Sequence, residues 1–229
     1  FLLGGDLRSS PDAAEVRSPY SGAVVGRAAL ATKADVVAAI DAAAAAAPAA
    51  AAMPTHARAA VLDRIAGALA DRREEISRLL AAEAGKPVSA ARTELDRTIF
   101  VFRQGSEEAK RIGGEVMPLD LMPHGEHRWG FTRRFPLAPI AAITPFNYPP
   151  LLAAHKLSPA IACGATMVLK PPPQDPLSTL LMAEIIAGAL TLDDDIEAAD
   201  LGGSQRVALT ALTQGMARAT AFPGDVLVV

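Results

Sequence analysis

The hydrophobic and polar positions between residues 136 and 170 predict a βαβ unit. An apolar run over residues 139–144 has the length of a strand and breaks at Pro145, where a helical stretch follows. A second apolar run, residues 166–169, stops at three consecutive prolines. Strand carboxyl ends and helix N-termini converge at one edge of such a unit, and ligands commonly bind there. Asn147 and Lys170 both fall at these strand ends, so the sequence predicts a site with one amide and one ammonium group.

Helical periodicity dominates the chain before this unit. Thr32 and Asp35 have the spacing of a capping box, and the alanine-rich sequence after them predicts a helix to about residue 47, ended by Pro48. Apolar residues then recur at a spacing near 3.6 over residues 55–85, which predicts one long helix. A further helix is predicted up to Gly113.

Three further segments have the pattern of strands or of a helix. Residues 1–6 and 16–28 predict an edge hairpin, and a helix is predicted over residues 177–188. Residues 129–135 alternate aromatic and small or polar side chains, with arginines near the end, which predicts an exposed strand. Such a strand serves equally well as a subunit contact or as a plain edge strand.

We therefore expect an α/β fold with a Rossmann-like parallel sheet and flanking helices. The predicted division is residues 1–135 as helical segment and oligomerisation strands, 136–189 as the βαβ core, and 190–229 as a divergent or truncated tail. The sheet needs its open edge covered. A helix at 205–219 with a strand at 225–229 would supply that cover, or self-association would.

Composition excludes several kinds of partner. The chain has 229 residues, 51% hydrophobic and 21% charged, with a net charge of −3 and interspersed basic residues, so we expect no nucleic-acid partner. The alanine tract from Ala42 to Met53 is interrupted by Pro48, which argues against a membrane span, and no secretory signal is visible. Cys163 is the single cysteine, so we expect a reducing, cytoplasmic location.

Each candidate residue also has a structural interpretation. Without the surrounding motif, a cap for the following helix is the favoured interpretation of Asn147, and a solvated strand end that of Lys170. Cys163 lies in an apolar helix end and is expected to be a buried small side chain rather than a nucleophile. His124 and His127 have a spacing compatible with metal ligands, but no third ligand accompanies them, so we expect a loop and no metal.

The central motifs resemble the cofactor domain of the NAD(P)-dependent aldehyde dehydrogenase superfamily. The resemblance covers about residues 1–189 and is carried by motifs in the order of the family: Ser18-Pro-Tyr-Ser-Gly22, Glu83-x-Gly85-Lys86-Pro87, Gly113-Gly114-Glu115, Ile143-Thr-Pro-Phe-Asn147-Tyr-Pro149, His155-Lys156-Leu-Ser-Pro-Ala160 and Val168-Leu-Lys170-Pro. It implies oxidation of a small-molecule aldehyde to a carboxylic acid, NAD or NADP as hydride acceptor, and a homo-oligomer, dimer or tetramer.

The resemblance also implies roles for single residues. Asn147 would hold the developing oxyanion with its side-chain NH₂. Lys170 would bind the hydroxyls of the adenine ribose. Pro172 and Pro173 would lie beside that ribose, and Pro173 stands where NAD-preferring members commonly have a glutamate, so NADP would be tolerated. Four residues would line the nicotinamide and adenosine by backbone contact: Ile143, Thr144, Pro145 and Phe146.

Several motifs of the family are not present intact in the 229 residues. These are the phosphate loop, the general-base glutamate and the nucleophilic cysteine; Asp200-Leu-Gly-Gly203 echoes the general-base motif but follows Lys170 too closely. We therefore expect this chain to be inactive alone. The alternative functions are a non-catalytic nucleotide-binding or interaction module, and an acyl-CoA-forming relative.

Overall fold

The computed structural model describes residues 1–190 and the backbone of residues 209–211. Its N-terminal half holds the strand pairs β1–β2 and β3–β4 and four long helices, and its second half holds the arm strands and the βαβ unit. The bounds are β1 Leu2–Leu3, β2 Asp6–Leu7, β3 Ala13–Arg17, β4 Val24–Ala29, α1 Lys33–Ala52, α2 Thr55–Asp71, α3 Arg73–Ala84, α4 Val88–Ala109, β5 Val116–Pro118, β6 Trp129–Phe131, β7 Ile140–Ile143, α5 Pro149–Cys163, β8 Met167–Lys170, α6 Leu177–Ala189 and β9 Leu209–Ala211.

The main sheet has the order β2-β1-β9-β8-β7. Strands β7, β8 and β9 run parallel, whereas β1 is antiparallel to both β9 and β2. The expected Rossmann-like α/β fold with flanking helices is confirmed. Because β1 and β2 from the N-terminus join the sheet of the βαβ unit, the first segment is continuous with the core; the division near residue 135 stays a prediction.

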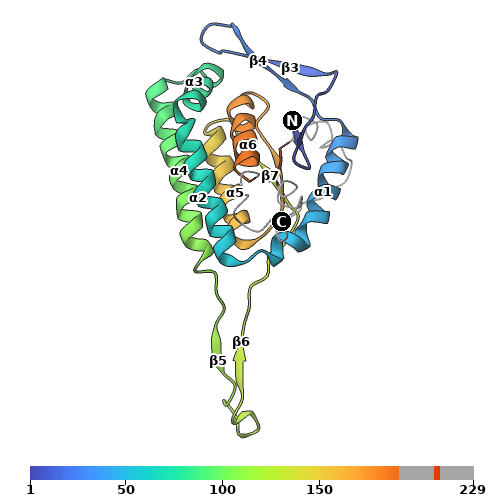
Figure 1. The fold of residues 1–229 in the computed structure, drawn as a ribbon, viewed down its shortest axis with the longest axis vertical. Helices are drawn as coiled ribbons and strands as arrows, with labels where there is room; N and C mark the ends of the chain where they lie inside the picture. Colours follow the sequence, from blue (N-terminus) through green and yellow to red (C-terminus); the bar gives the residue numbers. More distant parts are fainter. Residues whose placement is uncertain (191–208, 212–229) are drawn as a thin grey trace.

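The two faces of the sheet are covered by different helices (Figure 1). On β8, Met167 and Leu169 belong to the core shared with the bundle of α2, α4, α5 and α6, whereas Val168 packs with Val36 and Ala39 of α1. This alternation follows from the two-residue period of a strand. The hydroxyl of Thr166 also donates to the Ala43 carbonyl of α1 at 2.8 Å.

Two predictions on helices need correction. Helix α1 begins at the predicted capping box, in which the Asp35 amide donates to the Thr32 hydroxyl at 3.2 Å, but it continues through Pro48 to Ala52. An internal proline loses the hydrogen bond to the carbonyl four residues earlier and crowds that carbonyl, but it does not end this helix. The predicted helix over 55–85 is two helices, α2 and α3, separated at Arg72.

Helix α1 bears on the predicted absence of a membrane span. The helix has 20 residues, and an 18-residue window within it has a mean hydropathy of 1.4. By length and composition this is enough to cross a membrane, so the interruption at Pro48 is not a valid argument against a span. Its buried positions face the sheet. A single alanine-rich helix that covers a sheet is weak support for a span.

The strands β5 and β6 form an antiparallel hairpin that projects away from the body (Figure 1). Its apolar side chains, among them Val116, Leu121, Trp129 and Phe131, are largely exposed. We call residues 114–137 the arm. The strand predicted over residues 129–135 is therefore shorter, and its partner is β5.

The tail carries one further correction. Residues 209–211, predicted as part of a helix over 205–219, form strand β9 between β1 and β8. The edge of the parallel strands is therefore covered by the N-terminal hairpin across β9. The rest of that predicted helix and the predicted strand 225–229 lie outside the described residues.

Candidate functional site

The carboxyl ends of β7 and β8 lie side by side. Ile143 and Lys170 are partners in the parallel register, and the chain leaves β7 at Thr144. The amide and the hydroxyl of Thr144 each donate to the Lys170 carbonyl, both at 3.2 Å. The structure thus brings the loop that carries Asn147 next to the strand end that carries Lys170.

Lys170 is a buried cation at this edge. The residue is 7% exposed, and burial lowers the pKa of its ammonium group. Within residues 1–190, no carboxylate forms an ion pair with it. An ammonium group that is buried without a partner is costly, so the position suits a side chain that meets an oxygen-rich ligand.

Asn147 lies in the exposed loop between β7 and α5. The N-cap of α5 is Tyr148, which makes no side-chain capping bond, and the Leu151 amide instead donates to the Glu94 carboxylate at 3.4 Å. The interpretation of Asn147 as the helix cap is therefore wrong. Among the described residues, the Asn147 carboxamide has no hydrogen-bond partner, so it is available to a ligand.

The remaining predicted cofactor residues differ in how far they are exposed to solvent. Ile143, Pro145 and Phe146 are exposed, whereas Thr144 is buried against the β8 end. After β8, Pro172 is buried and Pro173 is half-buried. The loop thus offers an apolar surface beside an amide and a buried cation, while the roles of the individual residues stay predictions.

Two residues important for this geometry were missed by sequence reasoning, Lys86 and Glu94. The Lys86 ammonium lies 2.8 Å from a Glu94 carboxylate oxygen and donates to the Asn147 carbonyl at 3.3 Å. Its nitrogen also lies 5.2 Å from the centre of the Tyr148 ring. Burial raises the pKa of Glu94, and the Lys86 charge opposes that shift.

A second buried acid group holds the helix that follows β8. The Glu83 carboxylate accepts bonds from the Leu177 and Ser178 amides of α6 at 2.7 and 2.8 Å. A carboxylate at a helix N-terminus is favourable, because it satisfies free amides and the helix dipole.

Asp175 is a further buried acid close to this helix start. Burial, followed by the charge of Glu83, raises the pKa of Asp175 to about 8, so this carboxyl is largely protonated at neutral pH.

A signal for Glu94 is present in the sequence. The buried face of α4 includes Leu95, Ile99 and Phe102, and Glu94 and Thr98 occupy positions on that same face by helical spacing. An acid on an apolar helix face needs a buried partner. That partner is Lys86, in a motif that we interpreted only as a turn.

Cys163 lies at the opposite end of α5 from Asn147. The helix has 15 residues, so it separates the two by about 22 Å at 1.5 Å per residue. The Cys163 thiol is half-buried and donates to the Ala160 carbonyl at 3.3 Å. The thiol therefore cannot act on a substrate at Asn147. In the described part of the chain, no three His, Cys, Asp or Glu side chains are grouped to hold a metal.

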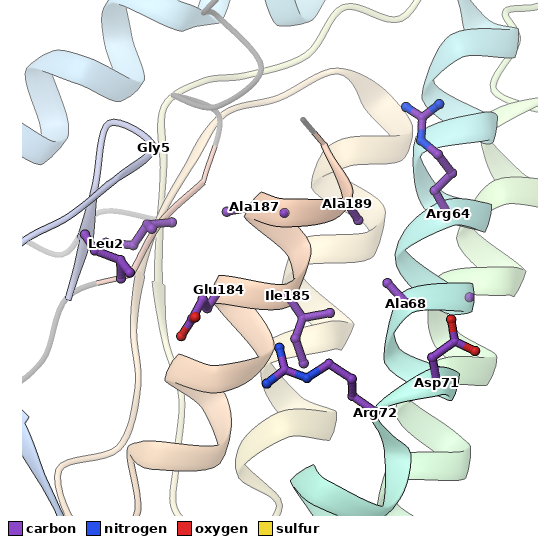
Figure 2. Close-up of a pocket in the computed structure, with 13 residues that line it drawn as sticks. Leu2, Gly5, Arg64, Ala68, Asp71, Arg72, Glu184, Ile185, Ala187 and Ala189 are labelled. Atoms are coloured by element: carbon purple, nitrogen blue, oxygen red, sulfur yellow. The ribbon is translucent and has the colours of Figure 1, made fainter. Parts of the chain in front are cut away.

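A large cavity lies elsewhere, between the β1–β2 hairpin, α2 and α6. Its volume is about 880 Å³. In Figure 2, Arg64 and Asp71 of α2 and Arg72, the residue that follows α2, lie on one side of the cavity, and Glu184 and Ile185 of α6 lie on another. None of the predicted site residues lines this cavity.

Comparison with known proteins identifies related sequences and structures. The model of the aldehyde dehydrogenase family matches residues 7–217. A 3-sulfolactaldehyde dehydrogenase from Priestia aryabhattai is 36% identical over 189 residues, 82% of this chain and 39% of that protein. The chain thus spans about two fifths of the length of this curated relative.

Two solved structures show the same arrangement. Aldehyde dehydrogenase 21 from Physcomitrella patens, in complex with the reaction product succinate, matches with a TM-score of 0.86 and 38% identity, over 98% of this chain and 44% of that one. The NADP-dependent glyceraldehyde-3-phosphate dehydrogenase from Bacillus halodurans, complexed with NADP, matches with a TM-score of 0.83 and 30% identity, over 94% and 43%.

Proposed function

Because the chain belongs to the aldehyde dehydrogenase family, we propose that it supplies the cofactor-binding part of an enzyme that oxidises an aldehyde to a carboxylic acid with NAD or NADP. The observation that carries the proposal is the pairing of a free carboxamide, Asn147, with a buried ammonium, Lys170, at adjacent parallel strand ends. This edge of an α/β sheet is where nucleotides and substrates bind.

Asn147 would act on the aldehyde oxygen. In the net reaction, the aldehyde and water give the carboxylic acid. Two electrons and one proton leave the aldehyde carbon as a hydride, and a second proton goes to solvent. When bound, the dinucleotide supplies the hydride acceptor. As negative charge develops on the oxygen, the Asn147 NH₂ group donates a hydrogen bond to it, and a donor of this kind lowers the barrier by about 3–4 kcal/mol.

Lys170 would bind the ribose of the dinucleotide. Its three N–H donors suit hydroxyl or phosphate oxygens, and burial strengthens these bonds. Pro173, which has neither donor nor carboxylate in its side chain, leaves room for a 2′-phosphate without charge repulsion. We therefore propose that NADP is accepted as well as NAD; the binding of NADP by the Bacillus halodurans relative supports this proposal.

We further propose that the 229-residue chain does not turn over aldehyde alone. Its single cysteine, Cys163, lies at the wrong end of α5 for attack on a substrate at Asn147. The same observation favours a second candidate function, a nucleotide-binding module without catalysis. The two candidates differ in whether a nucleophile completes the site.

The arm gives a reason to propose self-association. Trp129 is 76% exposed and Phe131 is 80% exposed on a hairpin that projects from the body. Exposed aromatic side chains on a short two-stranded ribbon favour pairing with another protein surface. We propose that the partner is a second copy of the chain.

A calorimetric titration of the 229-residue chain with NAD and with NADP tests the proposed function. We expect saturable binding of both nucleotides and no oxidation of added aldehydes. Binding to neither nucleotide contradicts both candidate functions. Aldehyde oxidation by the chain contradicts the assignment of Cys163 as structural, and a Cys163→Ala variant then shows whether that thiol is the nucleophile.

A further inference from the structure

Lys86 reaches the Asn147 loop from a different part of the chain. Helix α3 ends at Ala84 and is followed by Gly85, whose φ of 65° is left-handed. A side chain on Gly85 would meet the Pro19 ring at 2.5 Å, so the turn is closely packed. The ammonium of Lys86 then lies within 3.3 Å of the Asn147 carbonyl, 61 residues further along the chain.

Glu94 is the buried partner of the Lys86 ammonium group. The glutamate is 1% exposed, and its two carboxylate oxygens have different partners, Lys86 at 2.8 Å and the Leu151 amide at 3.4 Å. A buried carboxylate that loses its cation is strongly destabilised, so the contact between Lys86 and Glu94 is costly to break. Glu94 thereby ties the start of α5 and the Lys86 ammonium to the same buried group.

The residue after Asn147 is fixed by cations as well. The Tyr148 ring has the Lys86 ammonium 5.2 Å from its centre and the Arg97 guanidinium 5.8 Å from it. Contacts of this type are attractive because the face of the ring is electron-rich. The Asn147 carbonyl is thus held by a hydrogen bond, and the side chain of the next residue is held by cation contacts.

We propose that Lys86 is a positioning residue that immobilises Asn147 through its backbone carbonyl, with Glu94 as the support of Lys86. The consequence for catalysis, a carboxamide kept at one place for the oxyanion, rests on the proposed function. The immobilisation itself does not, because it concerns only the geometry of the chain.

Asn147 is the only asparagine in the 229 residues, which allows a direct test. Labelling with ¹⁵N- and ¹³C-asparagine makes this single residue visible by NMR. In the unaltered chain we expect a backbone order parameter of about 0.85, and in Lys86→Met a value below about 0.6. Lys86→Arg is expected to restore the high value, because a guanidinium can reach both the carboxylate and the carbonyl.

Two further variants keep the test decisive. Lys110→Met removes an exposed lysine that forms an ion pair with Glu107, and we expect it to leave the Asn147 order parameter unchanged. If Lys86→Met does not fold, the double variant Lys86→Met/Glu94→Gln removes the unpaired buried charge and keeps an acceptor for the Leu151 amide. An unchanged order parameter in a folded variant without Lys86 overturns the proposal.

Titration of the same samples with NADP separates the two proposals. Loss of Asn147 order on removal of Lys86, together with no nucleotide binding by the unaltered chain, supports the positioning role and contradicts the proposed function. Nucleotide binding with an order parameter insensitive to Lys86 supports the proposed function and contradicts the positioning role.

Discussion

Thr144 binds the carbonyl of Lys170 with both its amide and its hydroxyl group, each at 3.2 Å. The first residue after β7 is therefore fastened to the last residue of β8 by two bonds to one oxygen. Because the Asn147 loop starts at this point, a displacement of Lys170 would be passed to the loop. If the dinucleotide binds at Lys170 as proposed, its binding would therefore be structurally coupled to the position of the amide.

Replacement of Lys170 by methionine is expected to weaken the binding of NADP by about 1–3 kcal/mol, which raises the Kd about 5- to 150-fold, because a charge-assisted hydrogen bond is lost. Isothermal titration calorimetry measures the change. Burial lowers the pKa of Lys170, so we also expect NADP binding by the unaltered chain to weaken as pH rises through that lowered pKa. This dependence should vanish in the variant.

Asn147→Ala is the matched comparison for that variant. The amide is expected to act on the substrate oxygen and not on the ribose, so nucleotide affinity should stay nearly constant. Equal affinity of the Lys170 variant and the unaltered chain would show that the ammonium does not contact the nucleotide.

Pro173→Glu is expected to select NAD over NADP. A carboxylate at this position would accept a hydrogen bond from a ribose 2′-hydroxyl and repel a 2′-phosphate. We expect the ratio of the NADP Kd to the NAD Kd to rise by about tenfold or more, which corresponds to about 1.4 kcal/mol. The two nucleotides are titrated against both chains, and an unchanged ratio would place Pro173 away from the ribose.

Asp175→Asn is expected to stabilise the chain at neutral and higher pH. The pKa of Asp175 is raised to about 8 in the folded chain from 3.8. A carboxyl group whose pKa is higher in the folded than in the unfolded chain stabilises the fold fully at a pH below its pKa in the unfolded chain. This stabilisation is lost as the pH rises to the pKa of the folded chain. The variant has no such loss, so its gain should grow between about pH 4 and pH 8 and reach about 1–3 kcal/mol.

Urea unfolding at pH 5, 7 and 9 measures this difference. Asp41→Asn, at an exposed position of α1, is the control and should change stability by less than about 0.5 kcal/mol. A constant difference between Asp175→Asn and the unaltered chain over this range would contradict the assignment of Asp175 as a protonated buried acid.

Phe131→Arg is expected to disrupt self-association without unfolding the chain. The side chain is 80% exposed on the arm, so its replacement should change monomer stability by less than about 0.5 kcal/mol. Light scattering after size exclusion gives the mass, and the single tryptophan, Trp129, reports burial of the arm by its fluorescence.

Tyr20→Arg provides the control for the arm. Tyr20 is 93% exposed, but it lies in the turn between β3 and β4, away from the arm. We expect its replacement to leave the mass unchanged. A monomeric unaltered chain at micromolar concentration would refute association through the arm.

Sequence periodicity identified the βαβ unit because its strands are apolar runs and its helix has a clear boundary at Pro145 and Tyr148. It did not show that α1 passes through Pro48, since the packing of α1 against the sheet, which offsets the cost of an internal proline, is not visible in a local pattern. It also did not place β9, because a strand of three residues has too few positions to show a period.

The site divides in the same way. The sequence predicted that Asn147 and Lys170 lie at the same edge of the sheet, because the direction of the chain gives the carboxyl ends of the two strands, and the structure places these ends side by side. Lys86 and Glu94 were not found, because their importance comes from a contact with a loop 61 residues away. No local pattern in the sequence records such a contact, although an acid on a buried helix face is a warning that one exists.

The place of β9 in the sheet has a consequence for synthesis on the ribosome. Leu2 pairs with Ala211, so the N-terminal strand has no neighbour on that side until residue 211 has been made. At about 5–20 residues per second, this takes about 10–40 s of translation. The helices α2 to α5 are synthesised well before residue 211, so they can assemble while this edge of β1 is still unpaired. A nascent chain released before residue 211 would leave this edge of β1 exposed.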